Sequence, residues 1–488
     1  AALHDQFGVD VAGVEPAAQT ALGTIAADPV TVAVRRGRQI CAVVEGYHDE
    51  ATGVAIDVGS TTIAGHLVDL ASGEVLATHG LMNPQIRFGD DLMSRVSYAM
   101  MNPGGDRLMT DTVRIALDDL VCELVARSGT SRDSVFDVVI VGNPIMLLLV
   151  LGLDPVPLGL APFPLATDGA VTTRAAELGV AAPFAEAYLL PCIAGHVGAD
   201  TAAAILAEGP HRSAEVQLLV DVGTNAEIVL GSRDGLLAAS SPTGPAFEGA
   251  QISAGQRATA GAIERVRIDP ETLEPRSRGI GAASWSDEPA FTEDVAVSGV
   301  TGICGSGIIE ALGELYLVGV IAPDGTIRGE LADRTPRVVP DGRTFSYVLH
   351  APGEPGEIRV TQDDVRAIQL AKAALRAGID LLAEHGGIDP TGIDSIRLAG
   401  AFGAHIDPRY ATVLGLVPDV PVERVRSVGN AAGAGAVRAL LSAAQRREID
   451  STVAAVTKVE TAIEPRFQEL FVDAMAFPHA SAHPARST

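Results

Sequence analysis

The feature of this sequence that most constrains its fold is a short pattern that occurs twice. Residues 53–62 read Gly-Val-Ala-Ile-Asp-Val-Gly-Ser-Thr-Thr, and residues 218–225 read Leu-Leu-Val-Asp-Val-Gly-Thr-Asn. Each copy is an apolar run, typical of a buried strand, that ends in Asp-Val-Gly and a small polar residue before a second strand begins. Asp221 follows Asp57 by 164 positions, a domain-sized interval. The repeat therefore predicts two similar domains that each begin with the same hairpin.

The chemistry of this pattern indicates phosphate binding. A hairpin tip made of Gly and small hydroxyl residues lets backbone N–H groups approach phosphate oxygens. An aspartate at the strand end can hold Mg²⁺ through water, so Asp57 and Asp221 are the predicted catalytic and metal-binding residues. A single such motif is usually only a β-turn, but two copies on matched strands favour the binding interpretation. Two facing hairpins would hold a triphosphate through Gly59, Ser60, Thr61, Thr62, Gly223, Thr224 and Asn225.

Composition argues against a nucleic-acid surface and against a P-loop. The chain of 488 residues has 35 Lys and Arg against 61 Asp and Glu, a formal net charge of −26, which argues against nucleic-acid binding. Lys372 and Lys458 are its two lysines, and neither follows a P-loop glycine turn. Any nucleotide must then be bound without a P-loop lysine.

Three further glycine-rich segments are candidates for the same site. Residues 195–205 form a glycine turn into an alanine-rich helix, in which Asp200 either orients the attacking water or caps the helix. Residues 396–403 and 428–436 are predicted to admit a nucleoside against the backbone, although tight helix packing explains them equally well. The predicted nucleotide-binding residues there are Gly400, Ala401, Phe402, Gly403 and Asn430.

Residues 302–307 read Gly-Ile-Cys-Gly-Ser-Gly, a glycine turn before a helix over residues 308–317. Gly305 and Gly307 are predicted to border the nucleotide, whereas Cys304 is interpreted as a small buried residue. The four cysteines are scattered and contain no C-x-x-C pair, which indicates reduced thiols and a cytoplasmic protein.

Apolar and alanine-rich runs alternate from residue 51 onward, which predicts an α/β fold with helices covering sheets. Thr361 and Asp364 form a capping-box pattern for a helix over residues 361–384, which Gly386 and Gly387 end. Residues 138–153 are apolar but too short to span a bilayer, so we expect a buried strand, a turn and a helix. The predicted strands cover residues 53–57, 62–70, 138–141, 216–221, 226–230 and 395–398.

These elements predict the following domain organisation. Residues 1–50 look like the end of a linker or small middle domain, with a strand over residues 31–34. Two lobes then cover residues 51–210 and 211–440, the second with an inserted, loop-bearing segment at about 265–360. Residues 441–488 are expected to form a helical tail.

The order of these motifs resembles the superfamily of actin, sugar kinases and heat-shock chaperones. The finer strings are similar to the ATP-dependent reductive activators of corrinoid (vitamin B12) proteins. They occupy residues 83–91, 142–143, 219–228, 244–249, 302–307 and 398–403. The resemblance implies an actin-like (ribonuclease H-like), two-lobed ATPase fold with an internal duplication and an N-terminal remnant of a middle domain.

The resemblance further implies that the protein restores Co(I) from inactive Co(II) in a corrinoid protein of a methyltransferase system, using ATP and Mg²⁺. Members of the family carry a [2Fe–2S] centre in an N-terminal domain, but this chain has no C-x₄-C-x₂-C spacing. We therefore expect that domain to be absent here, with an electron donor acting through it or through a separate protein. The resemblance also implies a homodimer and no membrane partner.

Three alternatives share the fold. The cleft of a small-molecule kinase would transfer phosphate to a metabolite, and a non-catalytic scaffold would keep ATP for rigidity. A third possibility is the activator ATPase of another low-potential metalloenzyme, such as a 2-hydroxyacyl-CoA dehydratase.

Overall fold

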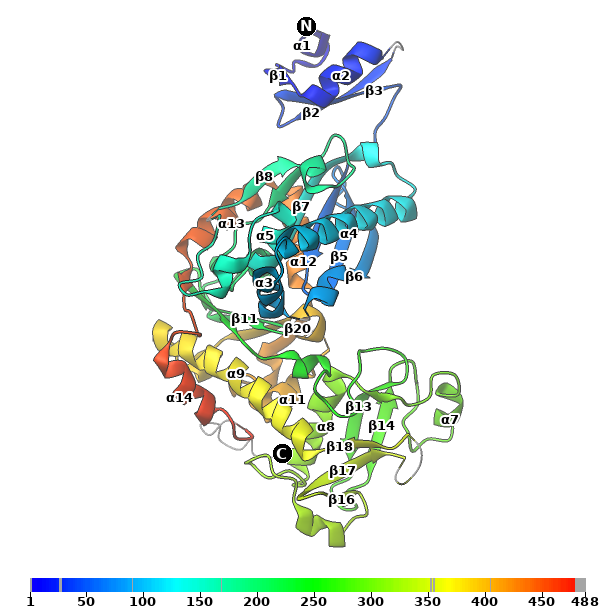
Figure 1. The fold of residues 1–488 in the computed structure, drawn as a ribbon, viewed down its shortest axis with the longest axis vertical. Helices are drawn as coiled ribbons and strands as arrows, with labels where there is room; N and C mark the ends of the chain where they lie inside the picture. Colours follow the sequence, from blue (N-terminus) through cyan, green and yellow to red (C-terminus); the bar gives the residue numbers. More distant parts are fainter. Residues whose placement is uncertain are drawn as a thin grey trace. The chain divides into compact units, whose positions relative to one another are not determined.

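The computed structural model describes residues 2–25, 29–89, 91–167, 169–351, 353, 356–403 and 405–478 (Figure 1). The chain divides into two compact units: unit 1 is Ala1–Ala207 with Ala432–Ala454, and unit 2 is Glu208–Ala431 with Ala455–Thr488. Each unit is built around one six-stranded sheet. The predicted α/β fold with an internal duplication is confirmed. Of the tail predicted at 441–488, residues 479–488 lie outside the described residues.

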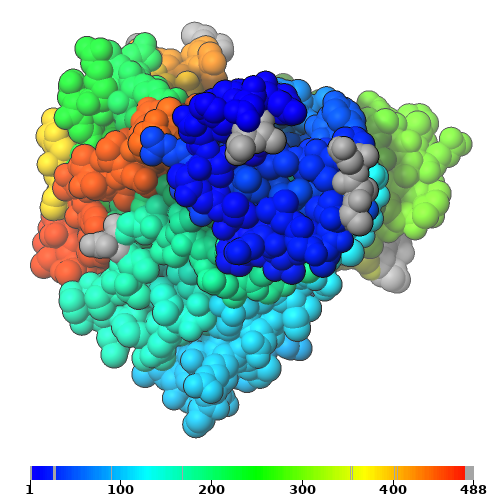
Figure 2. Space-filling view, turned by 90° about the horizontal axis from the view of Figure 1, so that it is seen from above, coloured from blue at the N-terminus to red at the C-terminus, as the bar shows by residue number. Residues whose placement is uncertain are grey.

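Residues 2–46 form a small N-terminal subdomain within unit 1, shown in dark blue in Figure 2. Its sheet has the order β1-β3-β2, with β1 parallel and β2 antiparallel to β3. The Arg35 guanidinium attaches it to the rest of the unit by donating to the carbonyl of Phe184 at 2.6 Å. The elements are α1 (Ala2–Phe7), β1 (Gly13–Val14), α2 (Pro16–Thr24), β2 (Val30–Arg35) and β3 (Gln39–Glu45).

The main sheet of unit 1 has the order β6-β5-β4-β7-β9-β8. Strands β4, β5 and β6 form an antiparallel meander, and β7 and β9 continue the sheet parallel to β4. Strand β4 is buried at every position except Asp57, as expected for a central strand covered on both faces. The strands are β4 (Thr52–Val58), β5 (Thr62–Asp69), β6 (Val75–Met82), β7 (Val135–Gly142), β8 (Val171–Arg174) and β9 (Glu186–Leu189).

Helices cover this sheet. Helix α4 buries Met109, Val113, Leu117, Leu120 and Leu124 at helical spacing and packs against β5 and β6. The strand, turn and helix predicted at 138–153 are confirmed as β7 and α5. The helices are α3 (Leu92–Met101), α4 (Gly105–Ser128), α5 (Pro144–Leu151), α6 (Ala199–Glu208), α12 (Ala431–Leu441) and α13 (Ala443–Ala455).

Two of the glycine- and alanine-rich runs let helices approach closely. A Cβ added to Gly435 of α12 would lie 1.9 Å from the carbonyl oxygen of Ala203 in α6. No side chain fits there, so tight helix packing explains this part of the run at 428–436.

The main sheet of unit 2 repeats the plan with the order β20-β19-β10-β11-β12-β21. Strands β10, β11 and β12 form the antiparallel meander, while β19 and β20 run parallel to β10. In both sheets the first four strands therefore lie in the order third, second, first and fourth. The strands are β10 (Gln217–Val222), β11 (Ala226–Ser232), β12 (Gly235–Ser241), β19 (Ser395–Ala399), β20 (Val425–Gly429) and β21 (Thr457–Lys458).

The segment inserted between β12 and α9 is an ordered subdomain with two three-stranded sheets. Helix α8 packs on β13, where the buried carboxylate of Glu310 accepts the N–H of Val266 at 2.9 Å and pairs with Arg265 at 3.1 Å. Its elements are β13 (Ala262–Ile268), β14 (Pro275–Gly279), α7 (Phe291–Asp294), β15 (Gly302–Ile303), α8 (Gly305–Leu317), β16 (Val338–Asp341), β17 (Thr344–His350) and β18 (Ile358–Val360).

Helix α9 (Gln362–Gly386) confirms the predicted capping box. The N–H of Asp364 donates to the Thr361 hydroxyl at 3.2 Å, and the N–H of Thr361 donates to the Asp364 carboxylate at 2.8 Å. Gly387 ends the helix at φ 60°. Three shorter helices complete unit 2: α10 (Gly400–Gly403), α11 (Pro408–Val413) and α14 (Pro465–Asp473). No helix of the described residues is both long enough and apolar enough to cross a membrane.

One of the two lysines attaches the C-terminal segment to α9. Lys372 is 0 % exposed, and its ammonium donates to the carbonyl of Ala474 at 2.6 Å and to that of Ala476. The ammonium also lies 5.6 Å from the centre of the Phe477 ring. Burial, and secondarily the nearby Arg376, lowers the pKa of Lys372 to about 7. The lysine is thus a structural group in unit 2.

We expect Lys372→Met to destabilise unit 2 by about 2 kcal/mol, because the carbonyls of two residues lose their donor inside the protein. The single tryptophan, Trp285, lies in unit 2, so urea unfolding followed by its fluorescence reports on that unit. Lys458→Met is the matched control, since Lys458 is exposed, and it should change stability by less than about 0.5 kcal/mol. Equal urea midpoints for both variants would contradict the structural role of Lys372.

Candidate functional site

The predicted site residues of unit 1 gather at one edge of its sheet. Strands β4, β7 and β9 are parallel, and Val58 pairs with Gly142, so the carboxyl ends of β4 and β7 meet. The hairpin tip at 59–61, which we call hairpin 1, follows β4, and Asn143 follows β7. Ligand sites in open α/β sheets lie at this edge. The edge carries Asp57, which is half-buried.

Hydrogen bonds to its carbonyl groups hold the tip of hairpin 1 in place. The N–H of Gly59 donates to the carbonyl of Thr62 at 3.0 Å, and a Cβ on Gly59 would lie 2.6 Å from that oxygen, so the turn requires glycine. Asn83 binds the turn twice, donating from Nδ2 to the Gly59 carbonyl at 2.9 Å and from its backbone N–H to the Thr61 carbonyl at 2.8 Å. Arg95 donates to the Ser60 carbonyl at 2.5 Å. The tip therefore has a defined backbone orientation.

Asp200 lies in the first turn of α6, one residue inside the helix start. Its carboxylate accepts the N–H of Thr201 at 2.7 Å. A Cβ on Gly198 would lie 2.6 Å from the same carboxylate and 2.5 Å from Cα of Asn143, so Asp200 is near the loop that follows β7. Burial raises the pKa of Asp200 to about 6. A carboxylate with this pKa can exchange protons near neutral pH.

Unit 2 gathers its candidates in the same way. Asp221 pairs with Ala399 of the parallel strand β19, and Ala399 pairs with Gly429 of β20. The hairpin tip at 223–225, which we call hairpin 2, and the loops at Gly400 and Asn430 therefore share one sheet edge. Gly400 has φ +88°, and a Cβ there would lie 2.4 Å from the Asp221 carboxylate. Because Gly400 has no side chain, the carboxylate of the half-buried Asp221 fits beside it.

Hairpin 2 is held by hydroxyl groups. The N–H of Gly223 donates to the Asn225 carbonyl at 2.9 Å. The Thr243 hydroxyl lies 3.3 Å from the carbonyl of Gly223 and 3.1 Å from that of Thr224. The hydroxyl of Thr224 in turn donates to the Glu248 carboxylate at 2.8 Å. The side chain of Thr224 is thus already hydrogen-bonded within unit 2. An anion at hairpin 2 would be bound by the backbone N–H of Thr224.

Three other predicted nucleotide residues have packing roles. A Cβ on Gly305 would lie 1.8 Å from the carbonyl of Phe247, and one on Gly307 would lie 2.2 Å from that of Ile263, so both glycines allow close backbone packing. The Phe402 ring is 9 % exposed and stacks on Phe247 at 5.5 Å. Phe402 therefore supports the loop from inside. The carbonyl of Gly403 accepts the Ser427 hydroxyl at 3.2 Å, and Ala401 stands between Gly400 and Phe402 in α10.

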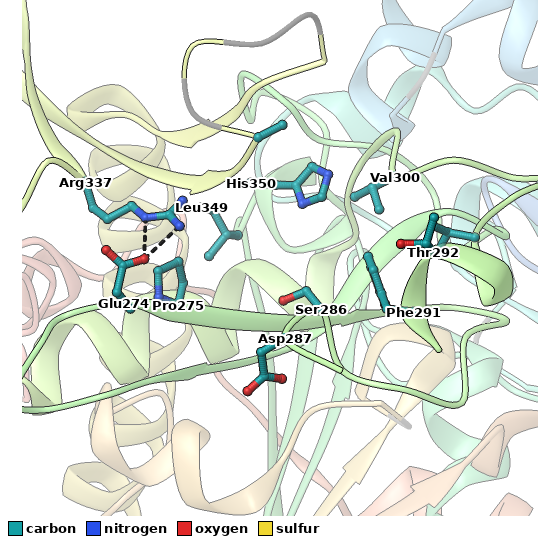
Figure 3. A pocket seen from close by; sticks show the side chains of 12 residues that line it. Glu274, Pro275, Ser286, Asp287, Phe291, Thr292, Val300, Arg337, Leu349 and His350 are labelled. Atoms are coloured by element: carbon teal, nitrogen blue, oxygen red, sulfur yellow. Dashed lines mark hydrogen bonds and ion pairs between the residues drawn. The ribbon is translucent and has the colours of Figure 1, made fainter. Parts of the chain in front are cut away.

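A separate cavity of about 580 Å³ lies in the inserted subdomain (Figure 3). Arg337 and Glu274 form an ion pair at 2.7 Å on its wall, and the pKa of His350 is lowered by burial and then by Arg337. None of its lining residues belongs to the loops after β10, β19 or β20. The cavity is therefore not the predicted nucleotide site.

The cysteines do not fit an iron–sulfur cluster. Cys41 lies in β3, Cys122 in α4, Cys192 after β9 and Cys304 before α8, and all are free thiols. Among the described residues no group of three or more His, Cys, Asp and Glu could hold a metal ion. A water-bridged Mg²⁺ needs only one or two carboxylates, and Asp57 and Asp221 are residues of this type. Cys304 is buried, as predicted, and its thiol forms a hydrogen bond of 3.3 Å with the Ser306 hydroxyl.

Comparison with known proteins identifies the family. The model described as the C-terminal domain of RACo, the ASKHA domain, matches residues 215–488, more than half of the chain. The model described as the RACo middle region matches residues 52–213. The chain belongs to the RACo family of corrinoid activators. Residues 1–51 lie outside both matches, so the RACo middle region corresponds to the predicted first lobe.

Individual RACo relatives agree with this assignment. The corrinoid activation enzyme RamQ of Eubacterium limosum is 34 % identical over 86 % of this chain and 69 % of its own length. A Methanosarcina barkeri reductase of the Co(II) methylated amine-specific corrinoid protein is 26 % identical over 75 % of this chain and 66 % of its own. A solved reductive activator for corrinoid, iron–sulfur protein is 31 % identical, with a TM-score of 0.84 over 100 % of this chain and 76 % of that one. The chain thus spans about two thirds of both curated relatives.

The structure of this RACo-family chain reveals groups that sequence reasoning missed. Arg95 and Thr243 were not predicted as site residues, and Asn83 was noted only as part of a family string. Asn83 directly follows β6, and Thr243 follows the equivalent strand β12 by two positions. Comparing the ends of the third strands in the two copies would have found this pair. No sequence signal marks Arg95, which a helix brings to the hairpin.

We expect Gly400→Ala to weaken binding of a magnesium nucleotide at least about tenfold. The new Cβ collides with the Asp221 carboxylate, and an alanine is strained at the left-handed φ of this position. The measurement is calorimetric titration with Mg²⁺ and the non-hydrolysable analogue AMPPNP, together with the melting temperature. Gly235→Ala is the matched control in the same unit, since a Cβ there would meet nothing within 4 Å and Gly235 lies at the other end of β11 from hairpin 2. Equal affinities for the two variants would contradict the role of Gly400.

Proposed function

We propose that this chain restores Co(I) from inactive Co(II) in a corrinoid protein of a methyltransferase system, driven by ATP binding and hydrolysis. One observation supports this proposal above the others. This RACo-family chain has an aspartate and a phosphate-type hairpin at the carboxyl edge of each of its two six-stranded sheets. The names of two relatives, the corrinoid activation enzyme RamQ and the Methanosarcina barkeri corrinoid-protein reductase, support the corrinoid target.

Within this proposal each of the two sheet edges offers groups that bind a magnesium nucleotide. The backbone N–H groups of hairpins 1 and 2 bind phosphate oxygens, and Asp57 and Asp221 hold Mg²⁺ through water. Mg²⁺ supplies neutralisation of the phosphate charge. The loops at Gly400–Gly403 and Asn430 receive the nucleoside. Asp200 positions the attacking water and accepts its proton.

The electron comes from a donor that the described residues do not contain. One electron converts Co(II) to Co(I), so a one-electron reductant suffices and no proton is consumed at cobalt. ATP acts on the protein: nucleotide binding favours a conformation with higher affinity for the Co(II) corrinoid protein, and hydrolysis releases it. We place this reaction in the cytoplasm.

The direct test combines the chain, titanium(III) citrate as reductant and a methylated amine-specific corrinoid protein in the Co(II) state. We expect the Co(I) absorption to grow only when Mg²⁺ and ATP are present. Asp57→Asn and Asp221→Asn should each lower the ATP-dependent rate at least about 100-fold. Asp69→Asn is the control, because Asp69 caps the turn at the opposite end of the β4–β5 hairpin.

Absence of any ATP-dependent Co(I) would overturn the proposal. ATP consumption without cobalt reduction, and with phosphate appearing on a metabolite, would indicate the small-molecule kinase instead. ATP hydrolysis that survives in both aspartate variants would show that the two sheet edges are not the nucleotide site.

The raised pKa of Asp200 predicts the pH dependence of ATP hydrolysis. The carboxylate must be ionised to accept a proton, so kcat should fall about tenfold per pH unit below about pH 6 and be level above it. Asp200→Asn should lower kcat and remove this acid limb. Asp137→Asn is the control: burial also raises the pKa of Asp137, but this β7 carboxylate pairs with Arg446 of α13 at 2.7 Å. Its acid limb should persist, and loss of the limb there would contradict the assignment.

A further inference from the structure

We infer that Arg95, together with Asn83, is a positioning residue that turns the backbone of hairpin 1 toward phosphate. The inference rests on the proposed nucleotide-binding function and adds the groups that prepare unit 1 for it. Arg95 is 0 % exposed, so its guanidinium does not reach a ligand from solvent. It acts through the hairpin that it contacts.

The contacts involve three consecutive peptide groups. Asn83 binds the carbonyls of Gly59 and Thr61, and Arg95 binds that of Ser60. The C=O of one residue and the N–H of the next point in opposite directions in a trans peptide. Because the carbonyls of Gly59 and Ser60 face Asn83 and Arg95, the N–H groups of Ser60 and Thr61 face away from them.

Those two N–H groups are available for an anion. The structure shows no hydrogen bond from the N–H of Ser60 or of Thr61 to a described residue. Consecutive N–H groups that point into the same space form an anion-binding concavity. Both residues are half-buried, so a phosphate there would be partly shielded from water. Fixing the carbonyls in advance removes the entropy that a mobile loop would lose on binding.

The guanidinium geometry suits this task better than an ammonium. Nε of Arg95 donates to the carbonyl of Gly89 at 3.0 Å, while Nη2 reaches Ser60. Nη1 lies 2.9 Å from the sulfur of Met146 and 3.4 Å from the Gln85 side chain. One planar group thus joins the hairpin, the segment before α3 and α5. A lysine offers a single point of attachment and cannot span these partners.

Helix α3 determines where Arg95 lies. Asp91 caps this helix by accepting the N–H of Ser94 at 2.7 Å and its hydroxyl at 2.9 Å. Gly89 permits the close approach, because a Cβ there would lie 2.6 Å from the Ser94 side chain. The family string at 83–91 therefore has a local purpose: Asn83 binds the hairpin, and Gly89 and Asp91 start the helix that carries Arg95.

Hairpin 2 provides an independent example of the same arrangement. There the Thr243 hydroxyl is shared between the carbonyls of Gly223 and Thr224. The N–H groups of Thr224 and Asn225 face the opposite way, and the structure shows no hydrogen bond from them to a described residue. Both copies thus bind the tip carbonyls from the end of the third strand, and Arg95 is the addition peculiar to unit 1.

The test uses the whole chain and Mg²⁺ with AMPPNP as the probe. Arg95→Met and Arg95→Lys remove the fork, and Asn83→Asp replaces the Nδ2 donor to Gly59 by a carboxylate oxygen. We expect the Kd for the probe to rise about 100-fold, about tenfold and about tenfold respectively. The control is Arg114→Met, because Arg114 donates to the Val150 carbonyl at 2.9 Å in the same unit, away from hairpin 1. Its Kd should change less than about twofold.

Hydrogen–deuterium exchange separates positioning from general loss of structure. In the wild-type chain we expect the probe to protect peptides covering residues 57–63 and 221–226. In the Arg95 and Asn83 variants protection at 57–63 should be lost while protection at 221–226 persists at saturating probe. The melting temperature shows which variants are folded, and Arg95→Lys, which keeps the buried positive charge, keeps the test valid if Arg95→Met unfolds.

Unchanged Kd and unchanged protection at 57–63 in a folded variant would overturn the inference and leave the proposed function standing. Failure of the wild-type chain to bind the probe would overturn both. Equal loss of protection at both hairpins would also overturn it, because Arg95 would then support the fold as a whole.

Discussion

In each of the two sheets the first strand pairs in parallel with the fourth, Val58 opposite Gly142 in unit 1 and Asp221 opposite Ala399 in unit 2. Parallel pairing requires a long crossover, and it brings the carboxyl ends of strands that are distant in sequence to one edge. The hairpin after the first strand and the loop after the fourth strand are neighbours because of this pairing. The first strand supplies the aspartate and the hairpin, the fourth strand supplies a loop beside it, and the inserted subdomain of unit 2 is accommodated within the crossover.

In the proposed function the backbone carries the phosphate chemistry, and neither lysine lies in a hairpin tip. Of the two lysines, Lys372 is buried against the carbonyls of residues 474 and 476, and Lys458 lies in β21. A surface with net charge −26 repels a polyphosphate, so binding must come from local groups. Fixed peptide N–H groups provide them without a mobile cation. This solution needs rigid carbonyl partners, which explains the buried amide, hydroxyl and guanidinium donors beneath the two tips.

The sequence revealed much of this arrangement because its signals are local. An apolar run that ends in Asp-Val-Gly predicts a strand and its turn, and repetition predicts the duplicated sheet. The capping box at Thr361 located α9 to within two residues. Packing was harder to predict: Gly305 and Gly307 look like ligand glycines, but the backbones of residues 247 and 263 occupy their open faces. Arg95 was missed because its partners, at 60, 89 and 146, are assembled only by tertiary structure.

The two copies differ in the side chains that bind the carbonyl groups of the hairpin. Hairpin 2 is held by the neutral hydroxyl of Thr243, and its Thr224 side chain donates to the carboxylate of Glu248. Hairpin 1 is held by a neutral amide and by the guanidinium of Arg95, a cation with no exposure to solvent. A guanidinium carries several donors in one plane, so Arg95 reaches the carbonyls of Ser60 and Gly89 and the sulfur of Met146 at once, whereas one hydroxyl serves both carbonyls of hairpin 2. The duplicated hairpins therefore fix their tip carbonyls by different chemistry, with the larger hydrogen-bonded network in unit 1.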